Sequence, residues 1–234
     1  MNTFISIVKE SFIDLIFPTI CIHCENRCEN SNEVFCYRCQ ILQKPTDHHL
    51  HKKNEFTHHF YGRVNIHTGA SLYYYNPGGI IHSVLEQIKY RGQQQWALRL
   101  GNYYADFLKQ SVHFQNIDII TAVPLHPSKQ ALRGYNQSAV FATGLSDKME
   151  VPCNFGILRK IRKDSSQTDK SRIERINNIF NSFEFNSKIN IKGKHILLAD
   201  DVLTTGATLE ACIIELMKGS PSSISLVCIA MGKN

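Results

Sequence analysis

The chain has 234 residues, of which 43% are hydrophobic and 20% are charged, and its formal net charge is +6. This composition favours a globular protein with one domain of about 150 to 200 residues and a small appendage. No apolar run approaches the roughly 18 residues of a membrane-spanning helix. The apolar stretch 4–17 contains Lys9, Glu10 and Asp14, which argues against a secretory signal. We therefore expect a cytoplasmic protein.

Residues 3–17 place apolar side chains at helical spacing, and Pro18 ends the pattern. The pattern predicts a helix that docks on another surface. A membrane-anchoring helix is the alternative, but it is disfavoured because the polar face is not basic.

Two Cys-x-x-Cys pairs follow, and eleven residues separate them. The predicted ligands are Cys21, Cys24, Cys36 and Cys39. Two such knuckles complete a four-thiolate Zn²⁺ site, which a short segment with little core needs in order to fold. Redox thiols and a metal-free knuckle remain as alternatives. Cys28 lies between the pairs as an extra cysteine.

The segment from about residue 40 to residue 63 is polar and rich in histidine. The histidine spacing is irregular and no set of acidic residues accompanies it, so the pattern favours a solvated linker over a metal site. We therefore expect an N-terminal part, 1–63, with the helix, the cysteine module and the linker. The main domain is expected to span 64–234.

The first half of the main domain predicts a strand at 69–75 and a helix that begins near Ile80, followed by a second helix at 94–109. The continuous apolar run 117–123 predicts a buried parallel strand. In an open α/β sheet ligands lie beyond the carboxyl ends of the strands. The loop 128–137 should therefore face a ligand.

Residues 158–177 form a basic segment, with seven Lys or Arg residues against three Asp or Glu, which is 7 − 3 = +4. Such a segment attracts polyanions such as pyrophosphate or nucleic acid. A solvated loop and helix face is the simpler alternative.

The stretch 196–208 carries the strongest signal in the chain. Four apolar residues predict a buried strand, Asp200 and Asp201 follow where we expect it to end, and a helix is predicted from about 207 to 218. The intervening loop offers backbone N–H groups and hydroxyls at the positive end of a helix, which suits a phosphate. The predicted phosphate-binding residues are Thr204, Thr205, Gly206, Ala207 and Thr208. Adjacent carboxylates can accept hydrogen bonds from a vicinal diol, so the stretch predicts a sugar phosphate site. An ordinary strand-loop-helix is the alternative.

This stretch resembles the 5-phosphoribosyl-1-pyrophosphate (PRPP) motif of type I phosphoribosyltransferases. A wider set of motifs resembles the ComF family of competence-associated proteins, in the order that this family shows. The set comprises the cysteine pairs, Lys-Tyr-Arg-Gly at 89–92, Val-Pro-Leu-His at 123–126, Arg-Gly-Tyr-Asn-Gln at 133–137, Gln167, Arg175 with Asn178, Phe180 and the stretch 196–208. The resemblance covers nearly the whole chain.

The resemblance implies a type I phosphoribosyltransferase-like α/β fold, with a mostly parallel sheet flanked by helices and a small N-terminal zinc-ribbon or knuckle module. It implies that the loop after residue 123 holds pyrophosphate, where His126, Lys129 and Arg133 have suitable charge and reach. Arg133 pairing with a surface carboxylate is the alternative. Asp200 and Asp201 would be the catalytic acids, and Mg²⁺ would accompany PRPP.

The resemblance also implies a part in handling single-stranded DNA during natural transformation. Arg162, Lys163 and Arg172 are the expected DNA-binding or cover-loop residues. Proteins of the competence machinery are expected partners, and they offer a route to peripheral association with the inner membrane. An active transferase that moves phosphoribosyl from PRPP to a base in nucleotide salvage is the alternative, for which the sequence specifies no acceptor.

Overall fold

The structure is a computed structural model that describes residues 18–30, 33–162 and 179–233. Its contacts divide the chain into two compact units, Met1–Lys44 and Pro45–Asn234. The division falls after Lys44, whereas the sequence placed the domain boundary after residue 63. The predicted helix 3–17 lies outside the described residues. Among the described residues, no helix has the length and apolar character needed to cross a bilayer.

The smaller unit has little regular structure. A bridge joins Ile20 to Arg27, and the helix α2, Tyr37–Leu42, begins directly after Cys36. The N–H of Ile22 donates to the carbonyl of Val34 at 3.0 Å. Two turns that carry the cysteines are thereby brought together without an extensive apolar core.

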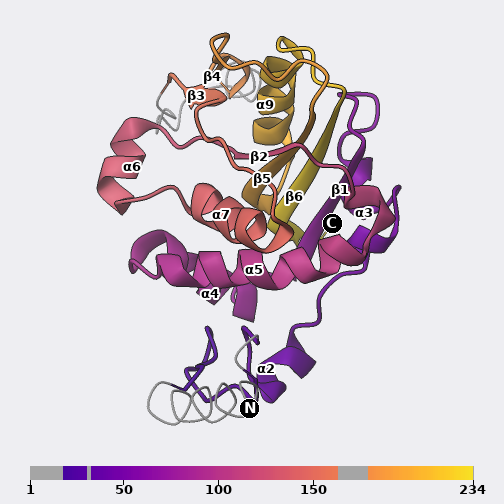
Figure 1. Ribbon diagram of the computed structural model, residues 1–234. Coiled ribbons are helices and arrows are strands. Elements are labelled where there is room, and N and C mark those ends of the chain that lie inside the picture. The colour runs from indigo at the N-terminus through magenta and orange to yellow at the C-terminus, as the bar shows by residue number, and fades with distance from the viewer. Residues whose placement is uncertain (1–17, 31–32, 163–178, 234) are drawn as a thin grey trace, which may run out of the picture. The chain divides into compact units, whose positions relative to one another are not determined.

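The larger unit is built on a parallel four-stranded sheet, which confirms the predicted fold class (Figure 1). Its strands are β1 (Thr68–Tyr75), β2 (Ile119–Ala122), β5 (His195–Leu203) and β6 (Ser223–Gly232). The spatial order is β1-β6-β5-β2. The two central strands, β5 and β6, are almost fully buried, which is why their sequences are continuous apolar runs rather than alternating ones.

Helices cover both faces of this sheet. The helix α9, Ala207–Met217, packs against one face, where Ile196 and Leu198 of β5 join Leu226 of β6 in the apolar core. Successive side chains of a strand point to opposite faces, and α7, Gln137–Met149, contacts β5 and β2. The helix α5, Gln94–Gln110, lies alongside α7 (Figure 1).

Further elements follow the strands of the larger unit. The helices α4, Ile80–Tyr90, and α6, Pro127–Arg133, follow β1 and β2. The strands β3, Leu158–Lys160, and β4, Phe183–Phe185, form a separate antiparallel pair that contacts α9. Between these two strands, residues 163–178 lie outside the described residues, and they include most of the predicted basic segment 158–177.

The histidine-rich segment is not a solvated linker, and that expectation was wrong. It forms η1, His48–Leu50, and α3, Glu55–His58, within the larger unit. Phe56 and Phe60 are 0% exposed and belong to the core beneath α9. The polar composition concealed these two anchors, and it also concealed that His48 and His49 are themselves buried, at 2% and 7% exposed.

Candidate functional site

The strands β2 and β5 bring the two predicted ligand loops to one edge of the sheet. They are parallel neighbours, with Ala122 paired to Ala199. The chain that leaves β2 and the chain that leaves β5 therefore emerge side by side at the carboxyl edge, where ligands bind in open α/β sheets.

The loop after β5 leads directly into the N-terminus of α9. Gly206 has φ +79° and precedes α9, and Thr204 and Thr205 are exposed. In the described part of the chain, the loop N–H of Ala207 makes only a long contact of 3.4 Å to Thr205 Oγ1. The first turn of α9 thus keeps N–H groups available at the positive end of the helix.

An arginine that the sequence analysis did not single out holds this loop. Arg63 donates at 2.9 Å to the carbonyl of Thr205 and pairs with Glu210 in the first turn of α9. Arg63 and Glu210 are 147 residues apart in the chain, and no local pattern marked either of them. With its carbonyl side fixed by Arg63, the loop can present its N–H side to a ligand.

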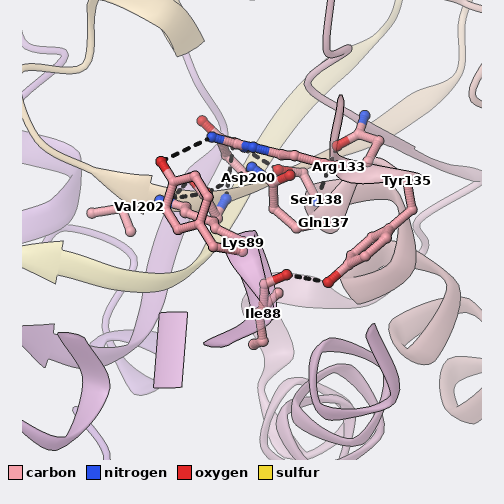
Figure 2. Close-up of polar contacts among 11 residues, drawn as sticks. Ile88, Lys89, Arg133, Tyr135, Gln137, Ser138, Asp200 and Val202 are labelled. Carbon is pink, nitrogen blue, oxygen red and sulfur yellow. Dashed lines mark hydrogen bonds and ion pairs between the residues drawn. The ribbon is translucent and has the colours of Figure 1, made fainter. Parts of the chain in front are cut away.

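The two acids lie within β5 rather than at its end, so the predicted strand end was wrong. Pairing with β6 continues through Leu203 and Met231, beyond both carboxylates. Both acids nevertheless contact the start of α7, and Figure 2 shows Asp200 beside Ser138. Ser138 Oγ donates to Asp200 Oδ1 at 2.9 Å, and Gln137 Nε2 donates to Asp201 Oδ2 at 3.0 Å.

The environments of the two acids differ. Asp200 is 8% exposed, and burial, together with the charge of Asp201, raises its pKa to about 7 although Ser138 and Lys89 oppose the shift. Asp201 instead accepts from Lys89 Nζ at 2.9 Å. Burial opposes the charge on Lys89, but attraction to Asp201 outweighs it and raises the pKa of Lys89. Near neutral pH, Asp201 is therefore the acid that keeps a charged partner.

The predicted pyrophosphate loop is largely helical, because 127–133 form α6 where the sequence predicted a loop. His126 caps this helix by accepting from the N–H of Ser128 at 3.2 Å. Lys129 is partly exposed on α6. Arg133 lies over the ring of Tyr90, 5.2 Å from its centroid. Among the described residues Arg133 has no carboxylate partner, so the alternative of a surface ion pair is not seen.

The residues expected to bind DNA are only partly described. Arg162 is exposed, two residues after the end of β3. Lys163 and Arg172 lie outside the described residues.

A cavity of about 670 Å³ opens beside the predicted pyrophosphate loop. Its lining includes Gly134, Tyr135 and Asn136 after α6, and Arg159 and Lys160 of β3. Asp200 and Asp201 do not line it.

The four predicted metal ligands converge in the smaller unit. The sulfur atoms of Cys21, Cys24, Cys36 and Cys39 all lie within 4.8 Å of one another. Cys24 Sγ is 3.5 Å from Cys36 Sγ and 3.7 Å from Cys39 Sγ. Tetrahedral Zn²⁺ with bonds of about 2.3 Å sets sulfur–sulfur separations of about 3.8 Å, so the cluster has the size and donor set for zinc.

The backbone around the cluster favours the thiolate of Cys21, whereas burial raises the pKa of Cys24 and Cys39. Burial opposes ionisation of Cys21, but backbone hydrogen bonds from Cys24, Cys36 and His23 lower its pKa to about 7. A thiolate is the form that binds a metal ion.

Comparison with known proteins agrees with this architecture. A family described as Phosphoribosyl transferase domain matches residues 136–234. Competence protein F of Haemophilus influenzae is 26% identical over 206 residues, covering 81% of this chain and 86% of that protein. Competence protein ComFC of Bacillus subtilis is 27% identical, covering 66% and 60%. DNA utilization protein YhgH of Escherichia coli is 26% identical, covering 52% of each chain.

Among solved structures, a purine phosphoribosyltransferase from Pyrococcus horikoshii matches with a TM-score of 0.38 and 20% identity, covering 58% of this chain and 74% of that one. The order of the motifs, the parallel sheet with its phosphoribosyl transferase domain and the four-cysteine cluster agree with one another. Together they support the assignment of this chain to the ComF family.

Proposed function

We propose that this protein binds PRPP with Mg²⁺ at the carboxyl edge of its sheet and acts in handling single-stranded DNA during natural transformation. The observation that carries the proposal is the meeting of three features at one edge. They are a helix N-terminus with available N–H groups, an acid pair and a cationic loop.

Each part of PRPP has a counterpart at this edge. The N–H groups and hydroxyls of 204–208 suit the 5-phosphate dianion. Asp201, with Asp200 beside it, suits the ribose hydroxyls, and His126, Lys129 and Arg133 suit the pyrophosphate. Mg²⁺ prefers oxygen ligands, and the carboxylates of Asp200 and Asp201 would hold it together with ligand oxygens. When bound, Mg²⁺ would neutralise charge on the pyrophosphate.

The DNA role is supported by the relatives and by charge. Matched proteins are named for competence and for DNA utilization. The basic segment 158–177 has a net charge of +4, and we assign Arg162, Lys163 and Arg172 to contacts with phosphates of the strand. Zn²⁺ is assigned a structural role at the four cysteines.

Catalysis by phosphoribosyl transfer is the second candidate, and the matched domain family supports it. In that case the acids would stabilise positive charge that develops at the anomeric carbon, and Lys129 and Arg133 would stabilise the departing pyrophosphate. The acceptor would be a nitrogenous base.

The first test is calorimetric titration of the zinc-loaded full chain with PRPP and Mg²⁺. Hydrogen bonds to a charged group contribute about 1.5–3 kcal/mol, so Asp201→Asn should weaken the binding of PRPP about 10- to 100-fold. Asp200→Asn should cost less, because this carboxyl is partly protonated near pH 7. Asp147→Asn, at an exposed position of α7, is the control. Absence of PRPP binding by the wild-type chain would overturn the proposal.

The DNA role has its own measurement. Binding of single-stranded DNA should weaken steeply with salt, and Arg162→Ala should weaken it while Lys192→Ala does not. Lys192 is exposed and precedes β5 at the opposite edge of the sheet. Release of pyrophosphate with one base from a panel would instead establish the transferase.

A further inference from the structure

The carboxyl end of α4 contacts both halves of the candidate site. Tyr135 donates its hydroxyl to the carbonyl of Ile88, and Arg133 lies over the ring of Tyr90 and donates to its hydroxyl at 3.4 Å (Figure 2). Between these two residues, Lys89 reaches Asp201 at 2.9 Å. One short stretch therefore connects the predicted pyrophosphate loop with the acid strand.

Asp201 is almost saturated with donors in this state. Its Oδ2 accepts from Lys89 and Gln137, and its Oδ1 accepts from the N–H of Val202 at 2.7 Å. A carboxylate offers about four acceptor positions. Two ribose hydroxyls or a cation can therefore bind Asp201 fully only if one of the present donors leaves.

Lys89 is the donor that can leave. The N–H of Val202 is part of β5, and Gln137 is 5% exposed in the first turn of α7. Lys89 carries its ammonium on a flexible four-carbon stem, and its side chain is 21% exposed. Its displacement requires no backbone movement.

If Lys89 leaves Asp201, its ammonium lies close to a second cation, Arg133. Arg133 is close enough for its charge to oppose that of Lys89, and among the described residues it contacts the Tyr90 ring rather than a carboxylate. Lys89 and Arg133 thus place two positive charges close together, with Asp201 as the carboxylate that pairs with Lys89. Such a pair of cations attracts a polyanion.

We infer that Lys89 is a pyrophosphate-binding residue that exchanges Asp201 for the pyrophosphate of PRPP when the ribose part of the ligand occupies Asp201. This inference rests on the proposed function and assigns to α4 a wall of that site. The competing explanation is that Lys89 only positions Asp201 and ends α4 favourably, since a cation is stabilised at the carboxyl end of a helix.

The two explanations predict that different ligands lose affinity when Lys89 is replaced. We would titrate the full zinc-loaded chain and its Lys89→Met variant with PRPP and, separately, with ribose 5-phosphate, each with Mg²⁺. PRPP should bind at least about tenfold more weakly to Lys89→Met, as expected for a lost charge-assisted contact. Ribose 5-phosphate lacks the pyrophosphate and should bind within about twofold of wild type, or more tightly, because its competitor for Asp201 is gone.

Three controls keep the outcomes distinct. Lys89→Gln retains a hydrogen-bond donor without the charge and should show the same weakening of PRPP binding. It serves as the second variant if Lys89→Met destabilises the chain. Lys89→Arg should retain most of the affinity for PRPP. Lys192→Met should leave the affinity for both ligands unchanged. Equal losses for both ligands, or no loss for PRPP, would overturn the inference while leaving PRPP binding intact. If the wild-type chain binds neither ligand, the proposed function itself fails, and the inference fails with it.

Discussion

Asp201 receives its hydrogen bonds from three separate parts of the chain. Lys89 comes from α4, Gln137 from α7 and the N–H of Val202 from β5 itself. Asp200, one residue earlier, meets Ser138 and is more deeply buried. The neighbouring side chains of Asp200 and Asp201 are of the same type but differ in accessibility and in their polar partners. Burial and partners, rather than residue type, set the pKa of a carboxyl group.

His195 provides a prediction at the same scale that is independent of any ligand. It is 8% exposed at the start of β5, its Nε2 lies 2.8 Å from Ser225 Oγ, and its ring contacts the ring of His67. Burial, with the charge of His67, lowers the pKa of His195, although the neighbouring Asp118 opposes this. The unfolded chain then binds a proton near pH 6.5 that the folded chain does not.

The sign follows directly. The contribution of neutral His195 to the free energy of unfolding is complete above about pH 6.5 and declines as the pH falls through that value. Chemical denaturation between about pH 7.5 and pH 5.5 should show a shallower decline for His195→Gln than for wild type. His58→Gln, at an exposed position, should leave the slope unchanged. A wild-type slope in His195→Gln would contradict the prediction.

At the scale of elements, the contact between α5 and α7 fixes the position of α7 on the sheet. It thereby positions Gln137 and Ser138, which contact the two acids. Gly101 and Gly144 lie where the two helices touch. A Cβ on Gly144 would lie 2.2 Å from the carbonyl oxygen of Leu98, and one on Gly101 would lie 2.2 Å from that of Phe141. The backbones approach so closely that neither position tolerates a side chain.

Gly144→Ala should therefore destabilise the larger unit in spite of the higher helix propensity of alanine. Backbone atoms cannot rotate away as a side chain can, so we expect a loss of at least about 1–3 kcal/mol in the free energy of unfolding. Urea denaturation measures it, with Asp147→Ala on the exposed side of α7 as the control. A gain in stability would show that the helices can separate without cost.

At the scale of the whole molecule, the two units are expected to respond differently to metal removal. The smaller unit has four converging thiols and little apolar core, whereas the larger unit has a two-sided sheet. Metal binding to such a small module supplies much of its folding free energy. A strong chelator should release about one Zn²⁺ per chain and expose 18–44 to protease, while the unfolding transition of 45–234 persists.

Substitutions separate the ligands from the extra cysteine. Cys39→Ser should reduce the zinc content measured by metal analysis, and Cys28→Ser should keep it, because Cys28 lies outside the cluster of four. Retention of zinc by Cys39→Ser would show that the metal, if bound, uses another ligand set.

Sequence patterns predicted the features that depend on neighbouring residues. Hydrophobic runs marked β1, β2 and the first part of β5, and the helix after Gly206 was placed correctly. The spacing of the cysteine pairs indicated their convergence. The pattern failed for 45–63, where Phe56 and Phe60 anchor a polar stretch, and at the end of β5, where pairing with β6 extends the strand past both acids.

The sequence by itself therefore determined the parallel α/β architecture, the four-cysteine module and the order of the family's motifs. Each of these is encoded by local spacing or by a continuous apolar run. Only the tertiary structure decided that Arg63 holds the loop after β5, that Lys89 meets Asp201 and that Asp200 is buried against Ser138. The physical reason is that these contacts join residues far apart in the chain, and their partners are chosen by how helices pack on the sheet.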